Sequence, residues 1–252
     1  GSVLLVLASI DCQLATLQLR AAAGGGVSAE LLEGHGAAAV GSSLKAAQER
    51  HCAPALGDLN GDGYADLLIG SGSGRLHAYR SLTNASASTS AFVPWSHGAA
   101  YDESLSSIGD PFAAAIQRQP VRGRARPFLV DIDGDSDLDL FVSCGGCGGG
   151  SAAIAFFRNG GASSQPRFER APPGLNPLAI AATMLIAAEN AQLVNETTLP
   201  PAPPLAFGDL DGDGAPEALL GGFVLHISGA LSAAADRTHL LSPSDLAVDA
   251  DA

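Results

Sequence analysis

Three acidic nine-residue segments, at 58–66, 131–139 and 209–217, most strongly limit what this chain can fold into. Each segment has oxygen-bearing side chains at positions 1, 3, 5 and 9 and a glycine at position 4. Twelve of the chain's 26 acidic residues lie in these segments, so the acidity is local. Because carboxylates gathered in water repel one another, a bound cation is the usual reason to cluster them. The segments therefore predict three metal sites.

The spacing of these oxygen ligands favours calcium. A loop that curls around one ion turns alternate side chains inward, and position 7 supplies a backbone carbonyl. No His or Cys occurs within the three segments, which disfavours zinc, copper and iron. We predict up to three Ca²⁺ ions, held by Asp58, Asn60, Asp62, Tyr64 and Asp66, by Asp131, Asp133, Asp135, Asp137 and Asp139, and by Asp209, Asp211, Asp213, Ala215 and Glu217.

Two of the loops depart from this pattern. Ser136 replaces the glycine at position 6, where the backbone often needs a positive φ. The third loop has Pro216 at position 8 and the longer Glu217 at position 9, so it is the weakest of the three.

The segments are not EF-hand loops, although they share the opening pattern of one. An EF-hand needs a bidentate Glu at position 12 and a helix on each side. Position 12 here is apolar, as Ile69, Val142 or Leu220. Short apolar segments precede and follow each loop, so each loop is expected to join two strands.

More than the loop repeats along the chain. Each loop strand is followed by a Gly-rich turn and another strand, as in 75–80, 154–158 and 223–227, and by a further short segment at 91–93 and 166–168. Repeated antiparallel four-stranded units predict an all-β fold, a β-propeller with four-stranded blades. The expected units of this single region are 1–50, 51–120, 121–200 and 201–252. The first is expected to be truncated, with a calcium loop upstream of Gly1, and the last is expected to stop after its third strand.

These residues resemble FG-GAP/VCBS-type repeats. The resemblance is carried by APALGDLNGDGYADLLIGSGSGRLHAYR (53–80), RPFLVDIDGDSDLDLFVS (126–143), FFRNGGASSQPRF (156–168) and PPLAFGDLDGDGAPEALLGG (203–222). The family includes the amino-terminal propellers of integrin α-subunits and many secreted repeat proteins. The resemblance implies calcium in the loops, a propeller usually of seven blades, and a role in adhesion or ligand binding. About three and a half units are visible, so we expect part of a larger protein or a smaller closed ring.

Two stretches fit the repeat less well and are expected to be insertions. Residues 98–125 carry a basic patch with Arg118, Arg122 and Arg124, which Arg126 continues. We expect this stretch to be a solvated loop, and a binding site for an anionic partner is the alternative. Residues 171–202 are expected to form a short helix that packs on the sheets. The longest apolar run, within this stretch, is too short to span a bilayer, so we expect no transmembrane segment.

The sequence favours an extracellular, secreted or cell-surface location. Asn84 and Asn195 lie in glycosylation sequons, and calcium loops of this kind are filled at millimolar calcium. Cys144 and Cys147 are expected to form a local disulfide, with free thiols as the alternative. A bond between Cys12 and Cys52 is also possible on the sequence alone.

The sequence contains none of the common catalytic motifs, and no enzyme is expected. His77 and His226 are interpreted as occupying related strand positions, which indicates packing or a surface position before catalysis. With a net charge of −13 and no broad basic face, the chain is not expected to bind nucleic acid. The leading hypothesis is a calcium-stabilised scaffold for a protein partner, adhesion or a larger assembly. The alternatives are a carbohydrate-binding propeller that uses Trp95 and Tyr101, and a lyase or hydrolase domain.

Overall fold

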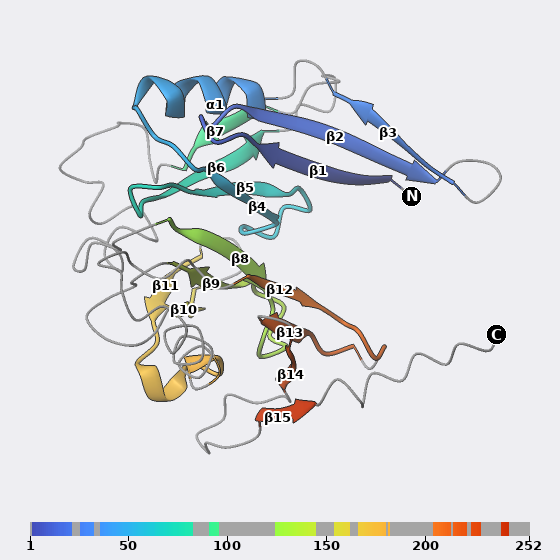
Figure 1. Ribbon diagram of the computed structural model, residues 1–252, viewed down its shortest axis with the longest axis vertical. Helices are drawn as coiled ribbons and strands as arrows, with labels where there is room; N and C mark the ends of the chain where they lie inside the picture. The colour runs from blue at the N-terminus through green and yellow to red at the C-terminus, as the bar shows by residue number, and fades with distance from the viewer. Residues whose placement is uncertain are drawn as a thin grey trace, which may run out of the picture.

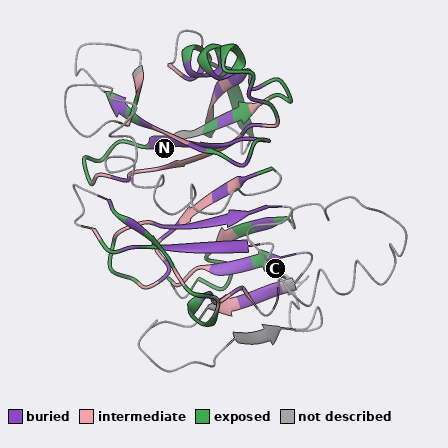
Figure 2. Cartoon of the chain, turned by 90° about the vertical axis from the view of Figure 1, so that its left-hand side faces the viewer, coloured by how far each residue is buried: buried purple, intermediate pink, exposed green. Residues whose placement is uncertain are grey.

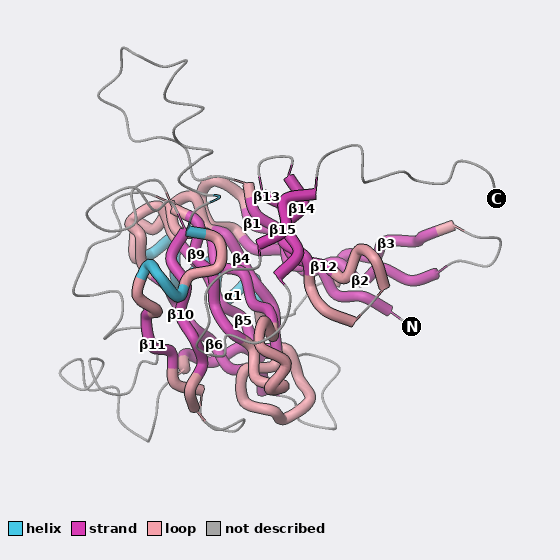
Figure 3. Tube along the Cα trace, turned by 90° about the horizontal axis from the view of Figure 1, so that it is seen from below, coloured by secondary structure: helices cyan, strands magenta, loops and turns pink. Residues whose placement is uncertain are grey.

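The chain folds into four antiparallel β-sheets and one α-helix. The computed structural model describes residues 2–21, 26–32, 36–82, 91–95, 124–144, 154–161, 166–179, 181, 204–212, 214–220, 223–227 and 238–241. In each sheet the strands are hydrogen-bonded in chain order, so each sheet is a meander. Strands and the loops that join them make up nearly all of the described chain (Figure 3).

The first sheet contains β1 (Ser2–Ala8), β2 (Leu14–Ala21) and β3 (Val27–Leu31). The second contains β4 (Ala53–Gly57), β5 (Asp66–Gly70), β6 (Leu76–Leu82) and β7 (Ala91–Pro94). The third contains β8 (Arg126–Val130), β9 (Asp139–Ser143), β10 (Ile154–Asn159) and β11 (Phe168–Arg170). The fourth contains β12 (Leu205–Gly208), β13 (Glu217–Leu220), β14 (Phe223–Ile227) and β15 (Thr238–Leu241).

The sheets follow one another in space in the order in which they follow in sequence (Figure 1). Their first strands lie next to each other, since β1 contacts β4, β4 contacts β8 and β8 contacts β12. Every sheet therefore meets its neighbours along the same strand.

The second strands of the second and third sheets are apolar on both faces because both faces are covered. In β5, Leu67 and Ile69 pack toward the first sheet, whereas Leu68 packs toward the third. In β9, Leu140 and Val142 pack toward the second sheet, whereas Phe141 packs toward the fourth. Successive side chains of a strand point to opposite faces, so one strand contributes to two cores. Buried residues are accordingly concentrated within the stack of sheets (Figure 2).

The fourth sheet has apolar residues at the same positions as the second and third sheets, but no described residue covers one of its faces. Leu59 and Ile132, at position 2 of their loops, are 4% and 5% exposed because they pack into the core shared with the following sheet. Leu210, at position 2 of the third loop, is 50% exposed. Leu219, which corresponds to Leu68 and Phe141, is also exposed. The face of the fourth sheet that would meet a further sheet thus keeps its apolar residues.

Helix α1 (Ala37–Ala46) covers the first two sheets. Its buried residues, Ala37, Val40, Gly41 and Leu44, have the spacing of one helix face. A Cβ at Gly41 would lie 2.7 Å from the carbonyl oxygen of Cys12, so glycine permits this close approach. Cys12 is also bonded to Cys52, which ties the β1–β2 turn to the start of the second sheet.

The last unit differs from the sequence-based expectation. It has a fourth strand, β15, so the prediction that it stops after its third strand is wrong. A ten-residue stretch separates β14 from β15, which hid the short fourth strand from a search for evenly spaced strands.

The two proposed insertions lie mostly outside the described residues. The described start of the second contains a short 3₁₀-helix, Pro173–Leu175, and the fully buried Leu178, which packs in the core between the third and fourth sheets. Asn176 donates a side-chain hydrogen bond to the carbonyl of Ile154. Among the residues that the structure describes, no helix combines the length and apolarity needed to cross a membrane.

Candidate metal centres in the strand-connecting loops

Each acidic segment forms the loop between the first and second strands of its sheet. The carboxylate at position 1 folds the loop by accepting backbone N–H groups. Asp58 accepts from Gly63 at 2.7 Å, Asp131 accepts from Ser136 at 2.9 Å, and Asp209 accepts from Gly214 at 3.2 Å. The donor is position 6 in every case, so the three loops share one fold.

Positions 4 and 6 of each loop have a positive φ. Position 4 is glycine throughout, with φ of 68° at Gly61, 74° at Gly134 and 78° at Gly212. Position 6 has φ of 84° at Gly63 and 89° at Gly214, and Ser136 adopts 72° at the same place. The expected left-handed conformation at position 6 is thus present, and Ser136 adopts it against its own preference.

We expect Ser136→Gly to raise the free energy of unfolding by up to about 1 kcal/mol, because the left-handed conformation costs glycine nothing. The exposed Ser136 side chain is dispensable and the backbone N–H to Asp131 is kept. Urea unfolding measures the change. Gly63→Ser is the matched reverse variant, since a Cβ there meets nothing within 4 Å. A loss of stability in Ser136→Gly would contradict the strain argument.

The carboxylate at position 9 is fully buried in all three loops and joins the loop to the sheet. Asp66 accepts the N–H of Leu59 at 3.1 Å and that of Ser81, in β6, at 2.8 Å. Asp139 accepts the N–H of Asn159, in β10, at 2.7 Å. Glu217 accepts the N–H of Leu210 at 2.6 Å. Position 9 therefore closes its loop and braces it against the sheet.

Burial raises the pKa of two of these groups far above the ordinary value. The pKa of Asp66 rises to about 6 and that of Asp139 to about 7. Neighbouring loop carboxylates add to the increase, whereas the backbone hydrogen bonds oppose it. Burial also raises the pKa of Asp135. Among the described residues, the carboxylates of the first two loops thus destabilise one another's charged forms.

These pKa values predict how the calcium-free protein responds to pH. Between the ordinary value of 3.8 and the raised values, folded Asp66 and Asp139 hold protons that the unfolded chain lacks. Stability in excess EGTA should therefore rise as the pH falls from about 8 to about 5.5, on the order of 2 kcal/mol from these groups. Denaturant unfolding at both pH values measures it.

Asp139→Asn supplies the control for the pH prediction, because the amide oxygen still accepts from Asn159 but no longer titrates. Its calcium-free stability should depend less on pH than that of the unchanged protein. An equal pH dependence in the two would show that other groups are responsible.

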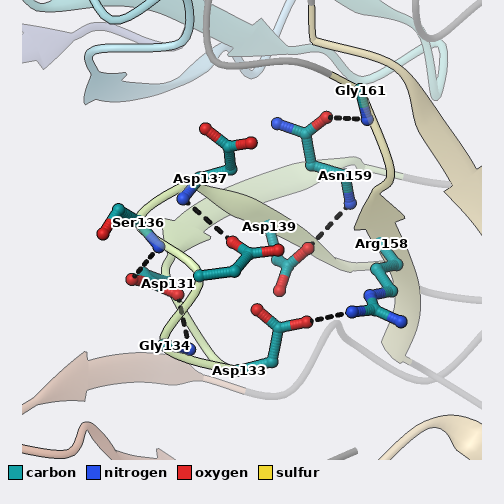
Figure 4. A network of polar contacts seen from close by, with 10 residues as sticks. Asp131, Asp133, Gly134, Ser136, Asp137, Asp139, Arg158, Asn159 and Gly161 are labelled. Carbon is teal, nitrogen blue, oxygen red and sulfur yellow. Dashed lines mark hydrogen bonds and ion pairs between the residues drawn. The ribbon is translucent and has the colours of Figure 1, made fainter.

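The second loop brings its predicted ligands closest together. Single carboxylate oxygens of Asp131, Asp133 and Asp135 all lie within 4.8 Å of one another. The carboxylates of Asp133 and Asp139 point toward each other, whereas that of Asp137 points away (Figure 4). Oδ1 of Asp133 and Oδ2 of Asp139 are buried without a hydrogen-bond partner. Such unsatisfied buried oxygens are costly, and a cation is the partner that four carboxylates at one place would accept.

The first loop has fewer converging carboxylates, because its position 3 is the amide Asn60. The side chains of Asn60 and Asp62 accept the N–H groups of Asp62 and Tyr64, which keeps the loop wound around its interior. Asp58 and Asp62 lie near enough to Asp66 to raise its pKa.

In the third loop, Asp209, Asp211, Ala215 and Glu217 are described, and Asp213 lies outside the described residues. Asp211 and Glu217 approach each other, but their third neighbour is His226, from β14.

The strand that faces each loop contributes a basic residue that the sequence analysis missed. Glu217 is paired with His226 in the β13–β14 register. Continuing the β5–β6 and β9–β10 registers by one residue places Arg80 opposite Asp66 and Arg158 opposite Asp139. Arg158 donates to Asp133 at 2.6 Å. His77 is paired with Ile69, so the interpretation that His77 and His226 are equivalent is wrong.

The described cysteines are all disulfide-bonded. Cys12 and Cys52 are joined across 40 residues. Cys144, which is fully buried, is also in a disulfide, and Cys147 lies outside the described residues. The sequons at Asn84 and Asn195 also lie outside them, as does Tyr101.

These features define a β-sheet repeat protein with an acidic strand-connecting loop in three of its four described sheets. Residues 53–89, which contain the first of these loops, match the FG-GAP repeat family. The match covers β4, β5 and β6 of the second sheet and agrees with the FG-GAP repeat resemblance of this segment. No curated protein and no solved structure matches the chain.

Proposed function

We propose that this chain is a calcium-stabilised, non-catalytic extracellular scaffold that binds a protein partner or assembles into a larger structure. The observation that carries the proposal is the pair of unsatisfied buried oxygens in the second loop, on Asp133 and Asp139. Calcium bound by six to eight oxygens would satisfy both atoms and compensate the surrounding acids.

The same repeat supports a propeller architecture. Each sheet meets its neighbours along its first strand, and the second strands of the second and third sheets contribute to the cores on both sides. The exposed Leu210 and Leu219 on the fourth sheet are the counterparts of residues that the second and third sheets bury against the next sheet. We propose that a further blade, or the first sheet of a closed ring, covers them.

The interaction role rests on what FG-GAP repeats are associated with, which is integrin-like adhesion and protein interaction. Disulfides in a chain of this kind are typical of oxidising compartments, which fits an extracellular location.

The carbohydrate-binding alternative has less support. Trp95 is partly buried, packs against the core between the second and third sheets, and donates its backbone N–H to Ala78. A stacking platform needs an exposed aromatic face, so Trp95 is better explained by packing.

The strongest catalytic-looking cluster also fits a structural role. Oε1 of the buried Glu49 accepts a hydrogen bond from Ser73 at 3.1 Å and lies 3.5 Å from Nε2 of His77. A nucleophilic triad places the imidazole between hydroxyl and carboxylate, whereas here the carboxylate lies between the other two. Burial raises the pKa of Glu49, but hydrogen bonds from Ser71 and Ser73 and the charge of His77 lower it more. The group is therefore a stable buried anion.

Calorimetric calcium titration of the full chain tests the metal part of this proposal. We expect calcium binding that Asp133→Ala weakens more than Asp211→Ala, since the second loop has more acids.

A glycan array tests the carbohydrate-binding alternative, and a panel of polysaccharide and ester substrates tests the non-catalytic assignment. Binding on the array would favour the lectin alternative, and turnover lost on mutating a His or Asp outside the loops would overturn the non-catalytic assignment.

A further inference from the structure

The third loop differs from the other two at the two positions that face each other across the strand register. Position 9 is Glu217 in place of Asp66 or Asp139, and the residue opposite is His226 in place of Arg80 or Arg158. Arginine stays protonated and has no acceptor atom, so it cannot bind a metal. A neutral imidazole can, and it is the commonest metal ligand among side chains.

The longer glutamate and the histidine are brought into contact. Oε1 of Glu217 lies 3.2 Å from Nδ1 of His226, while its other oxygen accepts the N–H of Leu210. Oδ2 of Asp211 lies 3.7 Å from the same nitrogen, and the three ligand atoms fall within 4.8 Å of one another. Glu217 is fully buried, and His226 is about one quarter exposed, which leaves an approach from solvent.

These distances suit a small tetrahedral ion. Two ligands each about 2.05 Å from tetrahedral zinc lie about 3.3 Å apart, close to the separations of His226 from its two carboxylates. Nitrogen and two carboxylate oxygens form a donor set that zinc accepts, whereas calcium prefers oxygen alone. The register also pairs His226 with His239 on β15, so the backbone brings two histidines to one level of the sheet.

We infer that Asp211, Glu217 and His226 form a site for zinc or a similar transition-metal ion, distinct in metal preference from the calcium loops. The site shares Asp211 and Glu217 with the third loop, so zinc would take the place of calcium there. It shares no residue with the first and second loops and does not require calcium in them. An FG-GAP-type sheet would then hold a second kind of metal at the edge of the stack.

The test is zinc titration of the full chain after chelator treatment, with Co²⁺ absorption in the visible range as a spectroscopic probe of tetrahedral nitrogen and oxygen ligation. We expect one tight zinc equivalent in the unchanged protein. His226→Gln should weaken it by at least about tenfold, since even outer-shell changes commonly cost a metal site that much. His226→Arg, which installs the residue of the other loops, should do the same.

His77→Gln is the matched control, because His77 is also partly buried beside a buried glutamate but belongs to no cluster of three ligands among the described residues. It should leave zinc affinity unchanged. Equal zinc binding by His226→Gln and the unchanged protein, or no tight equivalent at all, would overturn the inference.

Calcium-dependent melting is measured on the same samples to separate the two proposals. If calcium stabilises the protein and zinc fails to bind at His226, only the zinc site is refuted. If zinc binds through His226 and calcium has no effect, only the calcium proposal is refuted.

Discussion

Removing calcium with excess EGTA is expected to lower the free energy of unfolding by about 3 kcal/mol for each loop that is occupied at 100 times its dissociation constant. The reason is mass action, because the unfolded chain does not hold Asp131, Asp133 and Asp135 of the second loop around one point. Differential scanning calorimetry with and without calcium measures the change. Magnesium should restore little of the loss, since it prefers a smaller octahedral site.

Two Asp→Asn variants of the second loop test whether the position of a carboxylate or only the total charge determines the effect of calcium. Asp133 points toward Asp139 and has a buried unsatisfied oxygen, whereas the side chain of Asp137 points away from both (Figure 4). Each variant removes one negative charge. Asp133→Asn should lose the contribution of the second loop, and Asp137→Asn should keep most of it. Equal losses would mean that only total charge matters, and a melting curve unaffected by EGTA would refute calcium stabilisation altogether.

The strands around the loops were predictable because the pattern of burial is simple. Residues 67–69 and 140–142 are apolar without a break, and each run is a central strand with both faces covered. The clustering of the loop carboxylates was predictable for a related reason, since those of each loop lie within nine consecutive residues. Local sequence determines both features.

The basic residues opposite the loops were not predictable, because they depend on the lengths of turns. Five residues separate β5 from β6, ten separate β9 from β10, and two separate β13 from β14. Because these turns differ in length, the distance in sequence from the loop does not align His226 with Arg158. It instead suggested that His226 is equivalent to His77, which the strand register contradicts. Only the strand register identifies the equivalent positions.

The pairing of Cys12 with Cys52 was one open possibility on the sequence alone. Two facts that no local motif contains decide it. Helix α1 packs on the β1–β2 turn, and the chain then returns to begin β4 beside β1. These contacts bring the two Cα atoms to 5.0 Å, within the range that a disulfide requires.

The double variant Cys12→Ala/Cys52→Ala is expected to lose about 4 kcal/mol of stability. The bond closes a loop of 40 residues, and the chain-entropy estimate for a loop of that length has this size. Both cysteines are also buried in the core between the first sheet, α1 and the second sheet, so alanine avoids leaving buried thiols in their place. Guanidinium unfolding measures the loss, with calcium present so that the loops stay filled.

Reductant added to the unchanged protein should reproduce most of this loss of stability. Any effect of reductant on the double variant reports on the disulfide of Cys144. An unfolding midpoint in the double variant equal to that of the unchanged protein would show that helix packing alone holds the first sheet to the second, and that the bond adds nothing to the folded stack.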